Sequence, residues 1–315
     1  MKVTVIGAGN VGATCANVIA EKDFVNKVVL LDIKEGVAEG KALDIWETAP
    51  INEYSTRVNG YTNDYTQTKN SEVVVITSGL PRKPGMSRDD LIATNAGIVR
   101  SVTEQVIKYS PDAKIIVVSN PLDVMTYCAY LTAKVDSNRV FGMAGVLDTA
   151  RYRAFIASEL NISPRDIQAM LLGGHGDTMV PLPRYTTVSG IPVTELIPAD
   201  RLNAIIDRAK NGGGEIVNLL GTSAWYAPGA AAAQMVESIV KNENRIFPCC
   251  ALLNGQYGMK DIYLGVPVKL GKNGIEQIIE LKLNDGEMEL LNASAKAVRG
   301  VMDVLDKQLA AASTK

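Results

Sequence analysis

The sequence predicts an α/β protein with an N-terminal doubly wound parallel sheet and a C-terminal domain of mixed α+β structure. Up to about residue 145, short runs rich in valine and isoleucine alternate with segments long enough for crossover helices. Near-continuous apolar runs of this kind suit strands that are buried on both faces of a parallel sheet. After residue 145 the alternation stops, and shorter β-type runs mix with helices. We therefore expect two domains, residues 1–145 and residues 146–315.

The N-terminal half supplies the strands and helices of a βαβ repeat. The expected strands are Val3–Ile6, Val28–Leu31, Val73–Ile76 and Ile115–Val118, with a weaker one at Arg139–Gly142. The expected crossover helices are Asn10–Glu21, Glu35–Thr48 and Asp89–Tyr109. Parallel strands need connections of about this length, so the pattern indicates a parallel sheet with helices on both faces.

The C-terminal half has a different pattern. A helix is expected from near Val146 to about Leu160, and two β-type runs follow at Pro181–Val188 and Ile262–Leu270. The stretch Ala230–Ala233 predicts a tightly packed helix, either in the core or as a contact surface. The last helix, roughly Asp285–Leu309, carries apolar residues along one face and is expected to pack on the second domain.

Composition excludes several classes of protein. The chain is 47% hydrophobic and 21% charged, with a net charge of −2, which gives no electrostatic argument for a nucleic-acid or membrane partner. No window approaches about 20 uninterrupted apolar residues, and no signal peptide precedes the first strand, so we expect a cytoplasmic protein. The 4 cysteines lack CxxC spacing and only 1 histidine accompanies them, so no metal site is expected.

A glycine-rich loop joins the first expected strand to the first expected helix. It consists of Gly7, Ala8, Gly9, Asn10, Val11 and Gly12, and it fits the GxGxxG pattern. Asp32 ends the second strand, where a carboxylate accepts the ribose hydroxyls of a dinucleotide and repels a 2′-phosphate. The combination predicts a Rossmann domain that binds NAD rather than NADP, although the nearby Lys34 leaves NADP open. The alternative is an ordinary glycine turn followed by a strand-end acid.

His175 is the single histidine, and it follows the mostly apolar run Ile167–Leu172 in the glycine-rich loop Gly173–Asp177. Its ordinary pKa lies near neutrality, so its imidazole suits proton transfer at cellular pH. A structural histidine in a turn is the alternative. Asn120 follows an expected strand at its carboxyl end, where open α/β sheets bind ligands, but Asn-Pro is also a common turn pair.

Three arginines accompany these residues. Arg82 and Arg88 flank a loop rich in proline and glycine, which could close over an anionic substrate or remain a solvated basic loop. Arg151 follows Asp148 at the i, i+3 spacing near the start of a helix, which equally suits a local ion pair with Asp148 as a helix cap.

Together these residues resemble the NAD-dependent lactate/malate dehydrogenase family across essentially the whole chain, and more narrowly its lactate-dehydrogenase-like bacterial malate-specific branch. The motifs that carry the resemblance are Gly7–Gly12, Asp32, Pro81–Arg88, Val118–Pro121, Leu147–Arg151 and Gly174–Asp177. The resemblance implies reversible oxidation of (S)-malate to oxaloacetate, a reaction of the tricarboxylic acid cycle, with NAD as the cofactor.

The resemblance also implies roles for individual residues. His175 is the general acid/base, and Asp148 accepts its other ring N–H and raises its pKa. Arg151 grips the C1 carboxylate in a bidentate fork, Arg88 polarises the reacting carbonyl, and Asn120 hydrogen-bonds the reacting oxygen or the cofactor.

Further residues follow from the same resemblance. The backbone of Val118 and Ser119 lies beside the nicotinamide, and Asn95 lies near the cofactor. Arg82 decides the substrate, because the family typically has arginine at this position for a dicarboxylate and glutamine for pyruvate. The pair Ser223–Ala224 is expected near the substrate side chain.

Three alternatives stay open at this point. The alternatives to the malate-specific interpretation are a lactate or other 2-hydroxy acid dehydrogenase, a non-catalytic NAD-binding protein, and an NAD-dependent glycosidase on a related fold. The glycosidase needs a metal site, which no Cys/His cluster supports. The resemblance further implies a homo-oligomer, either a tetramer or a dimer.

Overall fold

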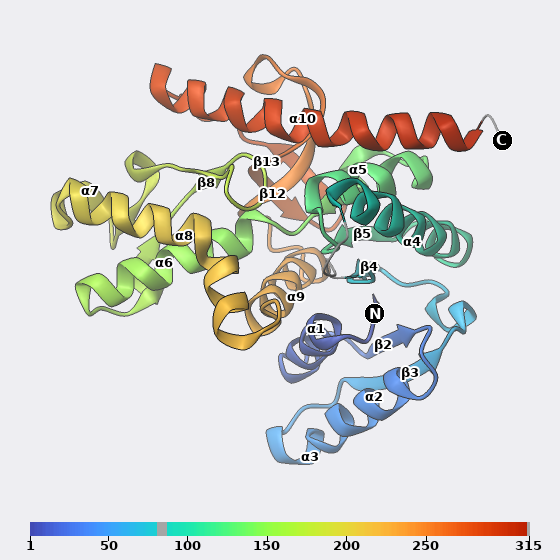
Figure 1. Ribbon diagram of the computed structural model, residues 1–315. Helices are drawn as coiled ribbons and strands as arrows, with labels where there is room; N and C mark the ends of the chain where they lie inside the picture. The colour runs from blue at the N-terminus through green and yellow to red at the C-terminus, as the bar shows by residue number, and fades with distance from the viewer. Residues whose placement is uncertain (81–86, 314–315) are drawn as a thin grey trace.

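The computed structural model describes residues 1–80 and 87–313, and a nine-stranded sheet runs through it (Figure 1). The sheet order is β14-β13-β12-β6-β5-β4-β1-β2-β3. Its parallel part consists of β1 (Lys2–Ile6), β2 (Lys27–Asp32), β3 (Arg57–Thr62), β4 (Val73–Ile76), β5 (Lys114–Val117) and β6 (Val140–Gly142). Every residue of β4 is buried, as expected for a strand covered on both faces. The predicted doubly wound parallel sheet is confirmed.

Helices cover both faces of this sheet. On the N-terminal side of the chain they are α1 (Asn10–Glu21), α2 (Val37–Glu47), α3 (Ala49–Asn52), α4 (Arg88–Tyr109) and α5 (Leu122–Ala133). In Figure 1, α1 packs beside α9 (Tyr226–Val240) on one side of the sheet, while α4, α5 and α10 (Asp285–Ser313) pack together on the other. The carboxyl ends of β1, β4 and β5 are left at one edge, where the glycine loop and Asn120 lie.

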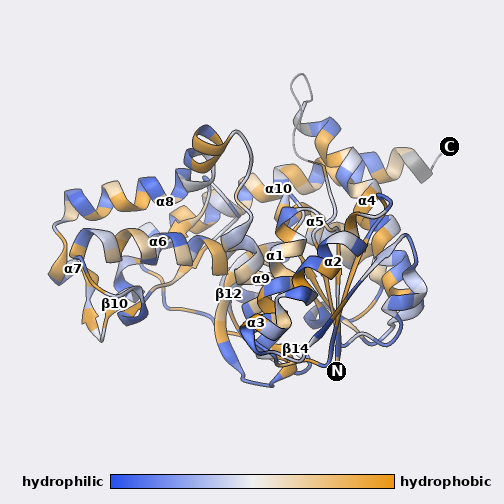
Figure 2. Cartoon of the chain, turned by 90° about the horizontal axis from the view of Figure 1, so that it is seen from below, coloured by the Kyte–Doolittle hydropathy of each residue, from blue (hydrophilic) through white to orange (hydrophobic). Residues whose placement is uncertain are grey.

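The C-terminal half adds to the same sheet and builds a second core. Its remaining elements are α6 (Gly145–Leu160), β7 (Ile167–Gln168), β8 (Leu171–Leu172), β9 (Val180–Pro181), β10 (Thr187–Val188), β11 (Ile191–Pro192), α7 (Val193–Leu196), α8 (Ala199–Leu220), β12 (Arg245–Asn254), β13 (Lys260–Gly271) and β14 (Gly274–Ile278). β12, β13 and β14 join as antiparallel strands. The second core lies between α6 and α8, with Tyr152, Ile156 and Leu202 buried in it. In Figure 2, α8 alternates between hydrophilic and hydrophobic colours, as a helix covering a core should.

The structure corrects three features of the predicted fold. Pro181–Val188 is two short strands, β9 and β10, separated by a 3₁₀ turn at Pro183–Tyr185, because a proline cannot donate to a strand ladder. β3 was missed because it is a partly exposed edge strand interrupted by Asn59 and Gly60. β12 was missed because Pro248 interrupts its apolar run.

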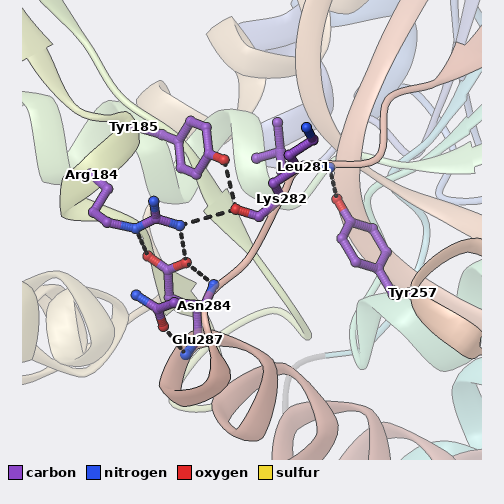
Figure 3. Close-up of polar contacts among 7 residues, drawn as sticks. All are labelled: Arg184, Tyr185, Tyr257, Leu281, Lys282, Asn284 and Glu287. Atoms are coloured by element: carbon purple, nitrogen blue, oxygen red, sulfur yellow. Dashed lines mark hydrogen bonds and ion pairs between the residues drawn. The ribbon is translucent and has the colours of Figure 1, made fainter.

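A polar cluster fixes the start of α10 (Figure 3). The Arg184 guanidinium donates to both carboxylate oxygens of Glu287, at 2.9 and 2.6 Å. Arg184 Nη2 and the Tyr185 hydroxyl donate to the Lys282 carbonyl at 3.0 and 2.9 Å. Asn284 and Glu287 complete a reciprocal cap, with side-chain oxygens accepting backbone N–H groups at 2.8 and 3.0 Å. This cluster sets the direction of the helix that passes behind His175.

None of the helices in residues 1–80 and 87–313 combines the length and the apolar character that crossing a membrane requires.

Candidate active site

The glycine loop has the conformation that its sequence predicts. Gly7 has φ +103°, and a Cβ there would lie 2.8 Å from the Ser78 nitrogen. A Cβ at Gly12 would lie 1.8 Å from the Gly7 carbonyl oxygen, so both positions require glycine. Gly9 precedes α1 and faces open space, with no atom within 4 Å of an added Cβ. The loop therefore offers exposed backbone at the positive end of a helix, which suits a pyrophosphate.

Asp32 lies against this loop. Its Oδ2 accepts the Ala8 N–H at 2.6 Å, and its Oδ1 accepts the Lys34 N–H at 2.9 Å. Two backbone donors thus fix the carboxylate beside the helix N-terminus. Each oxygen keeps a further lone pair, which is what two ribose hydroxyls need. The Asp32 carboxylate, with these acceptor oxygens, therefore fits the ribose of NAD.

The neighbouring strand ends are joined by short polar contacts. Val118 donates to the Ile76 carbonyl at 2.8 Å, and the Ser119 hydroxyl donates to the Ser78 carbonyl at 2.6 Å. Asn95 is buried, and its amide nitrogen donates to the Asn120 carbonyl at 2.7 Å while its oxygen accepts the Leu80 N–H at 2.8 Å. The side-chain amide of Asn95 is thus already hydrogen-bonded to the backbone of Leu80 and Asn120. Cofactor binding at Asn95 stays a prediction.

A charged cluster lies beyond these strand ends, in the first turn of α6 and the loop after β8. His175 Nδ1 lies 2.9 Å from Asp148 Oδ2, and Arg151 Nη1 lies 3.4 Å from Asp148 Oδ1. The side chain of Asp148 is only 3% exposed, so it holds both cationic partners in a buried position. Because Asp148 engages Nδ1, Nε2 is the ring nitrogen left for a substrate.

The electrostatics of this cluster favour a charged imidazole. Burial lowers the pKa of His175, but the charge of Asp148, its hydrogen bond and the charge of Asp123 act in the opposite direction. Together they raise the pKa of His175 above its ordinary value of 6.5, against a smaller lowering by Arg151. The neighbouring carboxylates therefore stabilise the protonated ring, an arrangement that suits general acid/base chemistry.

Arg151 is positioned by two glycines of α8. A Cβ at Gly212 would lie 3.2 Å from Arg151 Cδ, and one at Gly213 would lie 3.9 Å from both terminal nitrogens. Arg151 Nε is buried without a hydrogen-bond partner in the described part of the chain. The guanidinium therefore lies close to these two glycines, with a donor still available to an anion.

One cavity of about 420 Å³ connects these groups. Val11 of the glycine loop lines it together with Val118, Asn120, Arg151, His175, Ser223 and Ala224. The structure thus brings the predicted dinucleotide loop, the strand-end asparagine and the charged cluster to one space. Among the described residues, no group of three or more His, Cys, Asp or Glu side chains could hold a metal ion.

Two predicted substrate residues are not placed in this cavity. Arg82 lies outside the described residues. Arg88 is the first residue of α4, where Ser87 caps the helix by accepting the Asp90 N–H at 3.1 Å, but its side chain lies outside the described part of the structure.

Both halves of the chain match models of one family. The NAD binding domain of lactate/malate dehydrogenase matches residues 1–142, and the α/β C-terminal domain of the same family matches residues 145–308. The chain belongs to the lactate/malate dehydrogenase family.

Individual relatives of this family are similar over nearly the whole chain. A malate dehydrogenase of Cytophaga hutchinsonii is 72% identical over 306 residues, covering 97% of this chain and 98% of the relative. The structure of malate dehydrogenase from Salinibacter ruber matches with a TM-score of 0.94 and 57% identity, covering 98% of both chains. A lactate dehydrogenase of Cryptosporidium parvum, complexed with lactic acid and NAD, matches with a TM-score of 0.92 and 39% identity, covering 97% and 98%.

Membership in the lactate/malate dehydrogenase family confirms NAD as the cofactor, and residues 1–142, which include the glycine loop and Asp32, are its NAD-binding domain. The sequence reasoning missed two groups around the site, Asp123 and the glycines at 212 and 213. Asp123 follows Asn120-Pro121-Leu122 directly, and three consecutive glycines inside a helix are unusual because each costs stability. Either signal points to a local constraint, but neither says what the residue contacts.

Proposed function

We propose that this chain catalyses the reversible NAD-dependent oxidation of (S)-malate to oxaloacetate. The observation that carries the proposal is the buried Asp148–His175 pair, which lies beside Arg151 in the cavity that Val11 of the glycine loop also lines. Proton transfer, anion binding and dinucleotide binding are therefore available in one space. The relative from Cytophaga hutchinsonii, at 72% identity, is a malate dehydrogenase, which supports the substrate.

The chemistry follows from the charged cluster. His175 Nε2 takes the hydroxyl proton of malate as the C2–H bond breaks, and it returns the proton in the reverse direction. NAD, when bound, accepts the hydride from C2. Asp148 fixes the tautomer through Nδ1 and stabilises the imidazolium that forms. Reduction of oxaloacetate starts from the protonated ring, and the raised pKa of His175 increases the fraction of enzyme in that form at a given pH.

The remaining site residues complete the proposal. Arg151 binds the C1 carboxylate, Arg88 polarises the C2 oxygen, and Arg82 pairs with the second carboxylate. Asn120 binds the reacting oxygen or the cofactor. For NAD, we assign the glycine loop, Asp32, the backbone of Val118 and Ser119, and the position of Asn95.

The deciding experiment compares initial rates of NADH oxidation with oxaloacetate and with pyruvate, at one pH. We expect a preference for oxaloacetate of about a hundredfold or more, since an unpaired cation faces the pyruvate methyl group. Arg82→Gln should erode that preference, and Lys83→Gln serves as the matched loop control. Equal rates with both substrates in the wild type contradict the malate assignment, and an unchanged preference in Arg82→Gln contradicts the role of Arg82.

We also propose a homo-oligomer, a dimer or tetramer. Ile51, Leu219 and Tyr226 are 76%, 77% and 72% exposed, so they offer apolar area that a second copy of the chain could cover. Tyr226 also lines a groove of about 510 Å³ together with Ile45 and Ala230. Light scattering on the wild type and on Leu219→Lys tests this, and a wild-type monomer at micromolar concentration contradicts it.

Three further assignments complete the proposal. A cytoplasmic location is supported by four buried free cysteines, which suit a reducing compartment, and the reaction suits the tricarboxylic acid cycle. We place the division between the two domains at residues 145 and 146, which the family matches to 1–142 and 145–308 support.

A further inference from the structure

The backbone of the loop that carries His175 is held by three elements from distant parts of the sequence. Gly173 on this loop exchanges both backbone hydrogen bonds with Gly265 of β13, at 2.9 and 3.0 Å. The Gly174 N–H donates to the hydroxyl of Ser294 on α10 at 2.8 Å. The His175 N–H donates to Asp123 Oδ2, in the first turn of α5, at 3.1 Å. Gly173, Gly174 and His175 are therefore each held by hydrogen bonds to a different element.

The packing leaves this loop no room to shift toward its anchors. A Cβ at Gly174 would lie 2.7 Å from Val298 and 3.3 Å from Asp123 Oδ2. A Cβ at Gly265 would lie 2.3 Å from the Gly173 carbonyl oxygen. Because only glycine allows these approaches, the loop reaches α5 and α10 closely enough for both side-chain bonds to form.

Asp123 is an unexpected residue type for an anchor alone. A neutral acceptor would satisfy the His175 N–H, whereas a buried carboxylate costs solvation free energy. Its Oδ1 is buried and lacks an N–H or O–H partner among the described residues, and the weakly donating Cys250 thiol lies beside the carboxylate. Burial accordingly raises the pKa of Asp123, against a smaller lowering by the hydrogen bond from His175. A carboxylate kept in such a place implies a use for its charge.

The charged surroundings of His175 show what that use is. From α6, Asp148 raises and Arg151 lowers its pKa, and from α5 the charge of Asp123 raises it. Cys250 on β12 lies close enough to Asp123 for that carboxylate to raise the pKa of its thiol. Lys210 of α8 and Asp177 of the His175 loop also line the cavity. Asp123 is thus the second carboxylate acting on the imidazole, from a different element than Asp148.

We propose that Asp123 is a positioning residue for proton transfer. Its carboxylate anchors the His175 backbone and adds a second negative charge that stabilises the imidazolium. This inference rests on the proposed function, because it assigns Asp123 a part in the same proton transfer. Among the described residues, the Asp123 carboxylate hydrogen-bonds the His175 N–H and not Asn120, Arg151 or the glycine loop, so we infer that it acts through His175.

Two substitutions distinguish the two parts of this role, which are the anchoring of the His175 backbone and the negative charge beside the imidazole. Asp123→Asn keeps an acceptor for the His175 N–H but removes the charge. We expect the pKa of His175 to fall by about 0.5 unit or more, so the acid limb of malate oxidation moves to lower pH. Asp123→Ala also removes the acceptor, and we expect its kcat to be about tenfold or more below that of Asp123→Asn because the ring loses its position.

His175 is the only histidine, so its NMR titration gives one unambiguous imidazole signal without turnover. Ser238→Ala, which removes another buried hydroxyl contact at the Leu270 carbonyl, is the control and should leave the pKa of His175 and the kcat unchanged. The Kd for NADH should stay within about twofold in all variants, since Asp123 lies away from the glycine loop.

An unmoved pKa of His175 in Asp123→Asn overturns the proposal, and so does an equal kcat in Asp123→Asn and Asp123→Ala. If Asp123→Ala does not fold, the titration of Asp123→Asn still decides. A wild type that turns over neither malate nor oxaloacetate, but whose imidazole pKa falls in Asp123→Asn, would refute the proposed function while keeping the anchoring by Asp123.

Discussion

The two ends of the active-site cavity are built in different ways. At the cofactor end, recognition depends on backbone: the loop from Gly7 to Gly12 presents N–H groups, and its Ala8 N–H positions the Asp32 carboxylate. At the catalytic end, side chains from α5, α6 and the loop after β8 meet around His175, and glycine backbone of α8 lies close to Arg151. Backbone recognition tolerates most side-chain changes, whereas side-chain recognition depends on each contact.

The two ends also differ in electrostatic environment. Asp148 and Asp123 are both buried, so their charges act on His175 at low effective dielectric constant. Asp32 is half-buried at the cavity edge, where solvent screens it. We therefore expect substitutions at the catalytic end to change rates strongly, and those at the cofactor end to change affinity moderately.

The largest effect is expected for Asp148→Asn. The amide leaves His175 without its charge partner and presents a donor to Nδ1, which favours the wrong tautomer. We expect kcat to fall by about 10³- to 10⁴-fold, as when comparable His-orienting carboxylates are removed. Steady-state kinetics in both directions measure this, with the exposed Asp112→Asn as the control. A loss below about tenfold would show that Asp148 is not the partner that orients His175.

The same variant tests the pH dependence. In the wild type the pKa of His175 is raised, so the protonated form needed to reduce oxaloacetate persists to higher pH. The stabilisation of the fold by this ion pair is fully present below the unfolded pKa of about 6.5 and is lost as pH rises through the folded pKa. In Asp148→Asn the alkaline limb of oxaloacetate reduction should move to lower pH. Movement to higher pH would contradict this sign.

The next effect is expected at Gly212 of α8, which sharpens the contrast at the catalytic end. Gly212→Ala places a methyl group 3.2 Å from Arg151 Cδ, so the Arg151 side chain must shift by a few tenths of an ångström. We expect the KM for oxaloacetate to rise about tenfold, on the scale of one weakened charge-assisted contact. Melting experiments and kinetics together check it.

Gly40→Ala in α2, away from the cavity, is the control. An added Cβ there meets no atom within 4 Å, so KM should stay within about twofold, while alanine stabilises the helix by up to about 1 kcal/mol. Equal KM values in the two variants would show that Arg151 tolerates movement, and that glycine at 212 serves another purpose.

From the residues alone, sequence reasoning identified motifs whose members lie close together in the chain. The glycine loop and Asp32 are recognisable because strand, turn, helix and acid follow one another within one βαβ unit. The roles of Asp148, Arg151 and His175 came from family resemblance instead. From spacing alone, Asp148 and Arg151 suit a local ion pair, and the structure does contain that pair, with His175 added.

Sequence reasoning could not predict contacts between residues that are far apart in the chain. The bond from His175 to Asp123 spans 52 residues and that from Gly174 to Ser294 spans 120, so no periodicity links the partners. The same limit explains β12, whose place beside β6 depends on partners far away in the sequence. A buried aspartate at a helix start looks like an ordinary helix N-terminal acid until the loop above it is known.

The smallest effect is expected for Asp32→Ala at the cofactor end. The substitution removes the acceptor for the Ala8 N–H and for two ribose hydroxyls, but it leaves the loop backbone and its glycines in place. We expect the Kd for NADH to rise about tenfold, with discrimination against NADPH reduced, and kcat at saturating cofactor to change less than about threefold. Fluorescence titration with both cofactors measures this, with the exposed Glu35→Gln as the control. If kcat falls as steeply as affinity, the glycine loop and His175 are mechanically coupled, and the two ends of the cavity do not act independently.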